Sequence, residues 1–190
     1  MKFTPLELQG VWLIEPVRYG DSRGYFCETW KQDLFEQHVG KVCFVQDNES
    51  VSAYGVVRGL HFQRGEAAQA KLVRVSRGAV VDVIVDLRHG SPTYGRHLAV
   101  ELSADNGRQL FVPRGFAHGF AVVSRDEVAQ FQYKVDNTYC PEAEMTVPFN
   151  DADLAIAWPI SVEDMLLSEK DLRGTPFRRL TPDMLPSAVK

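Results

Sequence analysis

Short hydrophobic runs recur along the chain and are separated by Gly, Pro, Asn and Asp. The run at residues 79–87 alternates most regularly, with valines on one face and Asp82 and Asp86 on the other. A period of two is typical of a β-strand, so one face is predicted to pack in the core and the other to turn its carboxylates toward water or a cavity. Further strands are predicted at residues 11–17, 25–30, 42–46, 71–75, 97–102, 109–112, 120–123 and 128–134.

Helical patterns are sparse. One short helix is predicted over residues 31–38 and a second over residues 161–171, where Ser161 could cap the first turn. Many short strands with few helices predict an all-β sandwich or barrel. No repeat or linker divides the sequence, so a single domain is predicted over residues 1–190, with residues 174–190 as a C-terminal tail.

Composition narrows the class of protein. The net charge of −4 argues against a general nucleic-acid binder, although a few local arginines could still hold one nucleotide. Cys27, Cys43 and Cys140 are odd in number and widely spaced, which favours reduced thiols of the cytosol over disulfides or a zinc site. The sequence shows no signal peptide and no apolar stretch of roughly 20 residues, so a soluble, cytoplasmic protein without membrane association is expected.

A motif at residues 113–118, PRGFAH, matches PxGxxH, which is half of the signature of the metal-binding cupin barrel. The other half needs an HxH pair, and none of the five histidines forms one. Because zinc and iron sites usually need three protein ligands, neither a metal nor another cofactor is expected. His118 could then be a hydrogen-bonded core histidine or a donor to substrate.

The segment RGLHFQ at residues 58–63 offers the clearest chemistry. His61 faces away from its apolar neighbours Leu60 and Phe62 on a strand, and an imidazole can act as a base near neutral pH. A lone histidine would more simply be interpreted as a residue without a catalytic role. Its surroundings favour function, since two arginines that could bind anions, Arg58 and Arg74, are expected on neighbouring strands.

A carboxylate beside His61 would fix the tautomer of the imidazole and stabilise its charged form. Asp82 and Asp86 are candidates because they are expected on an adjacent strand. Asp171 is another, if the C-terminal helix crosses the barrel. Arg58 and His61 have opposite parity, so Gly59 is predicted to mark a backbone irregularity that turns both into one cavity.

Lys71 shares a strand face with Val73 and Val75, which predicts a position at the barrel mouth, because an unpaired ammonium in the core is unfavourable. There it could stabilise an enolate oxygen; a solvent-facing lysine is the alternative. The simplest interpretation of Tyr133 and Tyr139 is that they are packing residues. A phenol can also donate a proton, and its ring can stack on a nucleobase.

Two polar clusters are weaker signals. The cluster at residues 21–24 contains Arg23 and precedes an aromatic strand with Glu28, and the cluster at residues 46–50 contains Gln46 and Asn48. The residue types of either cluster, taken alone, are typical of a turn. The guanidinium of Arg23 would also suit binding of a diphosphate.

Several long segments in order carry a family resemblance. They are DSRGYFCETW, FVQDNES, VVRGLHFQ, QAKLVRVSRGAVVDVIVDLRHGSPTYG, LSADNGRQLFVPRGFAHGF, YKVDNTYCPEAE, NDADLAIAWP and LLSEKD. From about residue 11 to residue 171 the chain closely resembles the dTDP-4-dehydrorhamnose 3,5-epimerases. The resemblance implies a cupin-type jelly-roll barrel, a metal-independent homodimer and a dTDP-linked 4-keto-6-deoxyhexose as substrate.

The resemblance also implies residue roles. His61 is the general base, Asp171 its partner, Lys71 the group that supports the enolate and Tyr133 the acid on the opposite sugar face. Substrate contacts are implied for Arg23, Glu28, Gln46, Asn48, Arg58, His118, Tyr139, Glu144 and Lys170, with Tyr139 stacking on thymine. Phe149 departs from the family, which usually has tryptophan there, and only altered packing is expected.

Two alternatives stay open. Relatives with a very similar site invert C3 alone or C5 alone, so a mono-epimerase of a related nucleotide-linked ketosugar is the alternative enzyme. A cupin that binds a nucleotide sugar without catalysis is the alternative from another class.

Overall fold

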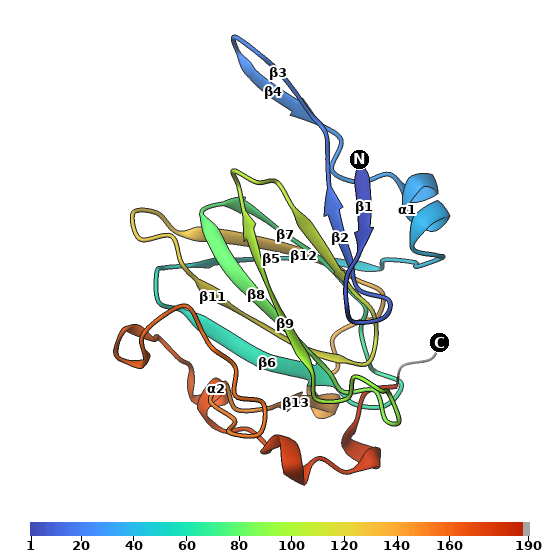
Figure 1. Ribbon diagram of the computed structural model, residues 1–190, viewed down its shortest axis with the longest axis vertical. Helices are drawn as coiled ribbons and strands as arrows, with labels where there is room; N and C mark the ends of the chain where they lie inside the picture. The colour runs from blue at the N-terminus through green and yellow to red at the C-terminus, as the bar shows by residue number, and fades with distance from the viewer. Residues whose placement is uncertain (188–190) are drawn as a thin grey trace.

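Two antiparallel β-sheets stack face to face in the computed structural model, which describes residues 1–187 (Figure 1). The six-stranded sheet has the order β1-β2-β10-β7-β12-β5, and the five-stranded sheet has the order β13-β6-β11-β8-β9. The strands are β1 Lys2–Pro5, β2 Trp12–Glu15, β3 Arg18–Asp21, β4 Gly24–Cys27, β5 Gln46–Ser52, β6 Val57–Gln63, β7 Lys71–Arg77, β8 Ala79–Asp86, β9 His97–Ser103, β10 Gln109–Val112, β11 Phe116–Val122, β12 Ala129–Val135 and β13 Glu144–Thr146. This is the predicted all-β, cupin-type jelly-roll.

A buried apolar cluster fills much of the barrel interior. Val75, Val80, Phe120 and Phe131 belong to a buried cluster contributed by both sheets. Phe120 and Phe131 stack with ring centroids 4.4 Å apart. Burial of this apolar surface holds the two sheets together.

Strand β8 packs on both faces. Val83 and Val85 lie in an outer cluster beneath the C-terminal segment, while Val80 and Ile84 face the barrel interior. The interior face also carries Asp82, which is fully buried. The sequence predicted that the carboxylates of this strand face either water or a cavity. The structure confirms the interior orientation for Asp82.

The predicted irregularity at Gly59 is confirmed. The pairing of β6 with β11 shifts register there, and Gly59 has a φ of +110°, a conformation that favours glycine. A Cβ on Gly59 would lie 2.6 Å from the Cα of Gly119. The two strands therefore approach each other too closely for any side chain at this position, and the register shift lets Arg58 and His61 line one cavity despite their opposite parity.

The helices of the structure match those predicted from the sequence only in part. Helix α1, Gln32–His38, forms as predicted, and its Phe35 is buried against the six-stranded sheet. The helix predicted over residues 161–171 is wrong: the structure has a 3₁₀ turn at Val162–Asp164 and a separate short helix, α2, at Glu169–Leu172. Ser161 makes no side-chain cap, whereas Ser168 and Asp171 form a reciprocal capping box on α2.

Strand boundaries also differ from the prediction. Residues 42–45 are not a strand, and the polar cluster that begins at Gln46 is itself strand β5. This strand forms one edge of its sheet, so its polar side chains alternate between the barrel and solvent.

The segment after Gly174 packs on the outside of the five-stranded sheet. It contains 3₁₀ turns at Phe177–Arg179 and Pro182–Met184, and Phe177, Leu180 and Leu185 pack in the outer cluster. Phe149 is buried with Val57, and the altered packing expected at this position stays a prediction. In residues 1–187 we find no helix with the length and apolar character needed to span a membrane.

Candidate active site

A cavity of about 400 Å³ opens where the edge strand β5 of one sheet faces β6 and β13 of the other. A volume of this order suits a small-molecule ligand. Nine of the predicted site residues line it: Gln46, Asn48, Arg58, His61, Lys71, Tyr133, Tyr139, Glu144 and Lys170. The structure thus gathers most of the predicted site from strands that are distant in sequence.

His61 lies in the middle of β6 and points into this cavity, while Leu60 and Phe62 pack on the outer side of the sheet. Its Nε2 is 2.8 Å from Oδ1 of Asp171. With Nε2 directed to Asp171, Nδ1 is the nitrogen left to exchange a proton with a ligand. The geometry therefore brings an imidazole and a carboxylate together from segments 110 residues apart.

Asp171 is itself held in place by hydrogen bonds. Its Oδ1 accepts from the backbone N–H of Gly59 at 2.9 Å, and its Oδ2 accepts from the Ser168 hydroxyl at 2.5 Å. Burial raises the pKa of Asp171, but the bonds from His61, Ser168 and Gly59 outweigh burial and lower it below the ordinary value. The carboxylate stays ionised beside the imidazole.

Lys71 and Tyr133 line the same cavity from the six-stranded sheet, whereas His61 lines it from the five-stranded sheet. The Lys71 ammonium lies 5.9 Å from the centroid of the Tyr133 ring. Burial lowers the pKa of Lys71 to about 8, against the opposing pull of Asp82 and Glu144. Burial also raises the pKa of Tyr133, so the phenol keeps its proton at neutral pH.

The open side of the cavity carries a linked set of polar groups. Tyr139 donates its hydroxyl to Oε2 of Glu144 at 2.6 Å, and the Lys170 ammonium forms an ion pair with the same carboxylate. The bond to Glu144 raises the pKa of Tyr139 to about 12. Arg58 donates to the Ser52 hydroxyl from Nε and Nη2 at 3.2 and 3.1 Å, which leaves Nη1 for a ligand.

His118 does not line the cavity. It lies opposite His61 in the pairing of β11 with β6, is 7% exposed, and its Nε2 is 2.8 Å from Oδ2 of Asp82. Burial lowers the pKa of His118 despite Asp82. The contacts are those of a hydrogen-bonded core histidine beneath the cavity floor.

Three expectations about neighbours need correction. Strands β6 and β7 belong to different sheets, so Arg58 and Lys71 face each other instead of lying side by side. Arg74 lies in a separate surface depression with Leu72 and Gln132 and does not reach His61. Asp82 and Asp86 are on β8, which β11 separates from β6, and Asp86 is bonded to Arg88 at the strand end.

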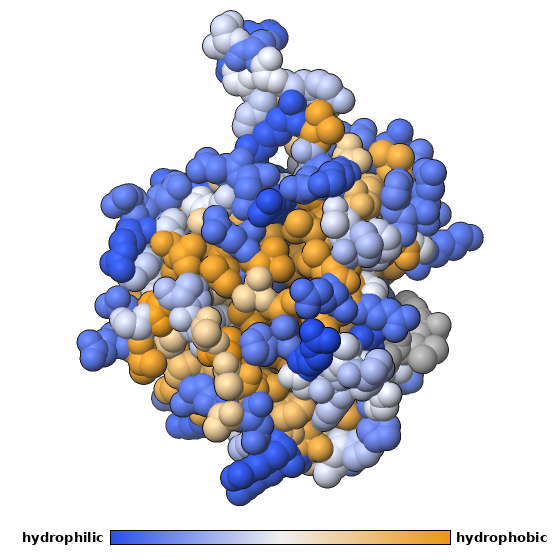
Figure 2. Space-filling model, in the orientation of Figure 1, coloured by the Kyte–Doolittle hydropathy of each residue, from blue (hydrophilic) through white to orange (hydrophobic). Residues whose placement is uncertain are grey.

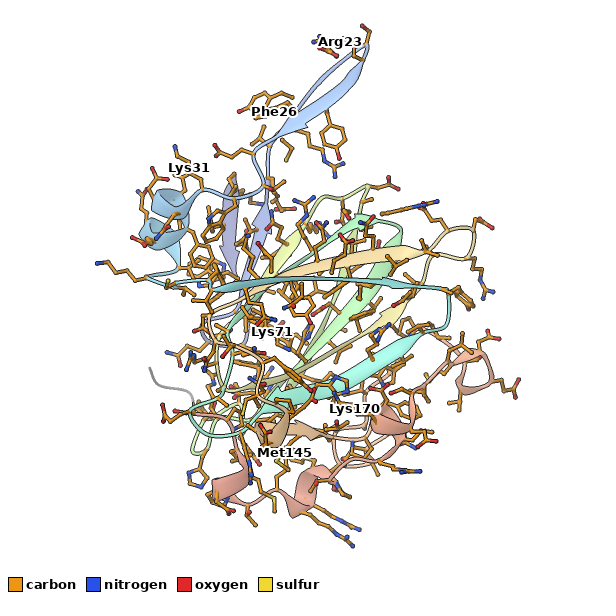
Figure 3. The ribbon with its side chains drawn as sticks, turned by 180° about the vertical axis from the view of Figure 1, so that it is seen from behind. Arg23, Phe26, Lys31, Lys71, Met145 and Lys170 are labelled. Atoms are coloured by element: carbon orange, nitrogen blue, oxygen red, sulfur yellow. The ribbon has the colours of Figure 1, made fainter. Side chains whose placement is uncertain are left out.

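Arg23 and Glu28 stand apart from the cavity. They belong to the β3–β4 hairpin and the residue after it, and this hairpin projects from the body of the molecule (Figures 1 and 2). Arg23 lies at its tip, far from Lys71 in Figure 3, and pairs with Asp21. Within one chain these two residues do not join the others.

The cavity also has a wall that the sequence did not reveal. Gln63, Gln69, Phe116 and Pro186 line it in addition to the predicted residues. Gln63 could have been found by parity, since it lies two residues from His61 on the same face of β6, whereas Gln69 precedes β7 and no strand pattern applies to it. In residues 1–187 no cluster of three or more His, Cys, Asp and Glu side chains is arranged to hold a metal ion.

A base on one sheet and a phenol on the other can exchange protons with opposite faces of one bound ring. A jelly-roll barrel with such a pair in one cavity is typical of a class of enzymes, the isomerases that move protons on a bound small molecule. The particular family follows from comparison with known proteins. The chain belongs to the dTDP-4-dehydrorhamnose 3,5-epimerase family, whose model matches residues 5–179.

Individual relatives are consistent with this family assignment. The dTDP-4-dehydrorhamnose 3,5-epimerase of Escherichia coli K12 is 51% identical over 91% of this chain and 92% of its own length. A structure of the dTDP-6-deoxy-D-glucose-3,5-epimerase of Legionella pneumophila in complex with dTDP-4-keto-L-rhamnose is 42% identical, covers 97% of both chains and has a TM-score of 0.92. The dTDP-4-dehydrorhamnose 3-epimerase of Streptomyces niveus is 42% identical over 90% of this chain and 81% of its own length.

Proposed function

We propose that this protein converts dTDP-4-dehydro-6-deoxy-D-glucose to dTDP-4-dehydro-L-rhamnose by inverting C3 and C5. One observation carries the proposal: His61 and Tyr133 line the same cavity from opposite sheets. Inversion needs proton removal and return on opposite faces of the sugar, and this arrangement supports both.

The C4 ketone of such a sugar acidifies the hydrogens on C3 and C5. His61 removes one of them through Nδ1, and Asp171 stabilises the imidazolium that forms. The electron pair moves onto the C4 oxygen, where the Lys71 ammonium stabilises the enolate. Tyr133 then gives its proton to the other face of the same carbon. Exchange with solvent then removes the proton from His61 and returns one to Tyr133, and repetition at the second carbon completes the double inversion.

The nucleotide holds the sugar between the two steps. The free Nη1 of Arg58 suits a phosphate oxygen, and the exposed ring of Tyr139 suits stacking on thymine. Gln46, Asn48, Glu144 and Lys170 provide further polar contacts around the opening. Binding energy from these remote groups fixes the reacting carbon near His61. The substrate contact expected of His118 stays a prediction, because this side chain does not line the cavity.

We also propose that the protein acts as a homodimer in which the β3–β4 hairpin of one copy completes the cavity of the other. The hairpin carries Tyr19, Tyr25 and Phe26 at 65%, 62% and 69% exposure. Exposed aromatic residues on a projecting arm favour burial against a partner. This arrangement would deliver Arg23 and Glu28 to a substrate that they do not approach within their own chain.

Co-expression of two inactive variants tests the shared site. A dimer of one His61→Asn chain and one Arg23→Ala chain would contain one cavity with both defects and one with neither. Random assembly should then restore about a quarter of the normal rate. If each hairpin served its own cavity, every site would carry a defect and no activity would return.

Heavy water tests the reaction itself. The ketosugar incubated with the protein should gain deuterium at both C3 and C5, as read by proton NMR. Label at one carbon would support a mono-epimerase, the second candidate, which the similarity to the Streptomyces niveus 3-epimerase favours. No label would support a non-catalytic nucleotide-sugar-binding protein. A cytoplasmic location and a single domain over residues 1–190 stay predictions.

A further inference from the structure

The C-terminal segment crosses the outside of the five-stranded sheet (Figure 1). The family model matches this chain only to residue 179. Residues 185–187, which we call the strap, lie beyond that match. Within the strap, Pro186 lines the same cavity as His61 and Tyr133.

Two backbone hydrogen bonds fasten the strap to the loop that follows β6. The N–H of Gly65 donates to the carbonyl of Leu185 at 3.0 Å, and the N–H of Ser187 donates to the carbonyl of Gly65 at 3.0 Å. Pro186 lies between these bonds and pairs with Gly65 in a parallel bridge. The ring of Pro186 is therefore held against the loop that connects the strand of His61 to the strand of Lys71.

Leu185 anchors the strap from the other side. Its side chain is 6% exposed and packs in the outer cluster with Phe62. An apolar anchor next to two backbone hydrogen bonds fixes Pro186 before a ligand arrives, and such preorganised surfaces bind with less loss of entropy. Proline has no N–H, so its backbone nitrogen can face an occupied cavity without needing a partner.

We propose that the strap is a binding element of the catalytic cavity and that Pro186 is a wall residue that sets the affinity for the nucleotide-linked sugar. The proposal rests on the proposed function, because it assigns the cavity to that substrate. Pro186 has no group that can move a proton or stabilise charge. Its contact strengthens ground state and transition state alike, so its loss raises KM and leaves kcat unchanged.

Two shortened chains test the strap. A chain that ends at Leu185 loses Pro186 and Ser187 but keeps the anchor, while a control chain that ends at Ser187 keeps the whole strap. Steady-state rates with the ketosugar should show KM raised about tenfold in the first chain, with kcat within about twofold of the control. Equal KM values in the two chains would overturn the proposal, and so would a loss confined to kcat.

Full-length variants test the same contact in a chain that is not shortened, so misfolding of the shortened chain does not affect the result. Pro186→Gly removes the ring and should raise KM, while Pro186→Val keeps apolar bulk and should restore most of the affinity. Equal KM values for these two variants would also overturn the assignment. The unmodified chain separates the two proposals: absence of turnover in it contradicts the epimerase function, whereas normal turnover with no effect of the strap contradicts the strap alone.

Discussion

Replacing Lys71 by methionine should make the protein more stable at neutral pH and nearly inactive. Lys71 extends between the sheets (Figure 3), and burial lowers its pKa from 10.5 to about 8 even though Asp82 and Glu144 oppose the change. The folded state thus disfavours the ammonium form. A methionine of similar length would keep the packing and remove the charge.

The magnitude follows from the two pKa values. The difference between 10.5 and about 8, at about 1.4 kcal/mol per pKa unit, corresponds to about 3 kcal/mol. Below about pH 8 both the folded and the unfolded chain hold the proton on Lys71, and the full destabilisation is present. Between about pH 8 and 10.5 only the unfolded chain holds it, so the destabilisation declines, and above 10.5 it is gone.

Urea unfolding of the Lys71→Met variant at pH 7 and at pH 10 measures this effect. The gain in the free energy of unfolding should approach about 3 kcal/mol at pH 7 and be much smaller at pH 10. Lys41→Met, at an exposed lysine, should change stability by less than about 0.5 kcal/mol at either pH. The turnover of Lys71→Met should fall by about 10²–10³. A variant no more stable than the parent at pH 7 would refute the view that Lys71 is a strained, desolvated cation.

Further predictions concern the unmodified site and the bulge beneath it. The kcat/KM should decline above about pH 8, because this ratio follows the titration of the free protein and deprotonated Lys71 cannot stabilise an enolate; a kcat/KM that stays level to pH 9.5 would contradict this. The His61→Asn variant should lose deuterium exchange at both carbons, and appreciable residual exchange would point to another base. Gly59→Ala should lower the free energy of unfolding by more than about 3 kcal/mol, since a Cβ there meets Gly119 at 2.6 Å. Gly90→Ala is the control, with a φ of +77° but open space, and should cost about 1 kcal/mol in urea unfolding.

The sequence predicted the barrel because its strands are short, alternating and separated by turn residues. It missed strand β5 because an edge strand with one solvated face can be almost wholly polar, as Gln46–Ser52 is. It overestimated the C-terminal helix because acidic residues after Ser161 suit a first helical turn, whereas tertiary packing decides whether so short a segment stays helical.

For the candidate site, parity alone placed His61 opposite Leu60 and Phe62 and required an irregularity at Gly59. Parity could not assign strands to sheets, which is why Arg74 was expected near His61 although it faces outward. No local pattern could place Asp171 against His61 or Pro186 in the cavity wall, because both positions depend on how the C-terminal segment wraps the sheet.

The central claim is that His61 and Tyr133 act on opposite faces of one bound sugar. The most direct test is the Tyr133→Phe variant in heavy water, followed by proton NMR of the ketosugar. We predict that deuterium enters with the original configuration retained, because His61 can still remove and return a proton on its own face. Inversion at the normal rate in this variant would contradict the claim.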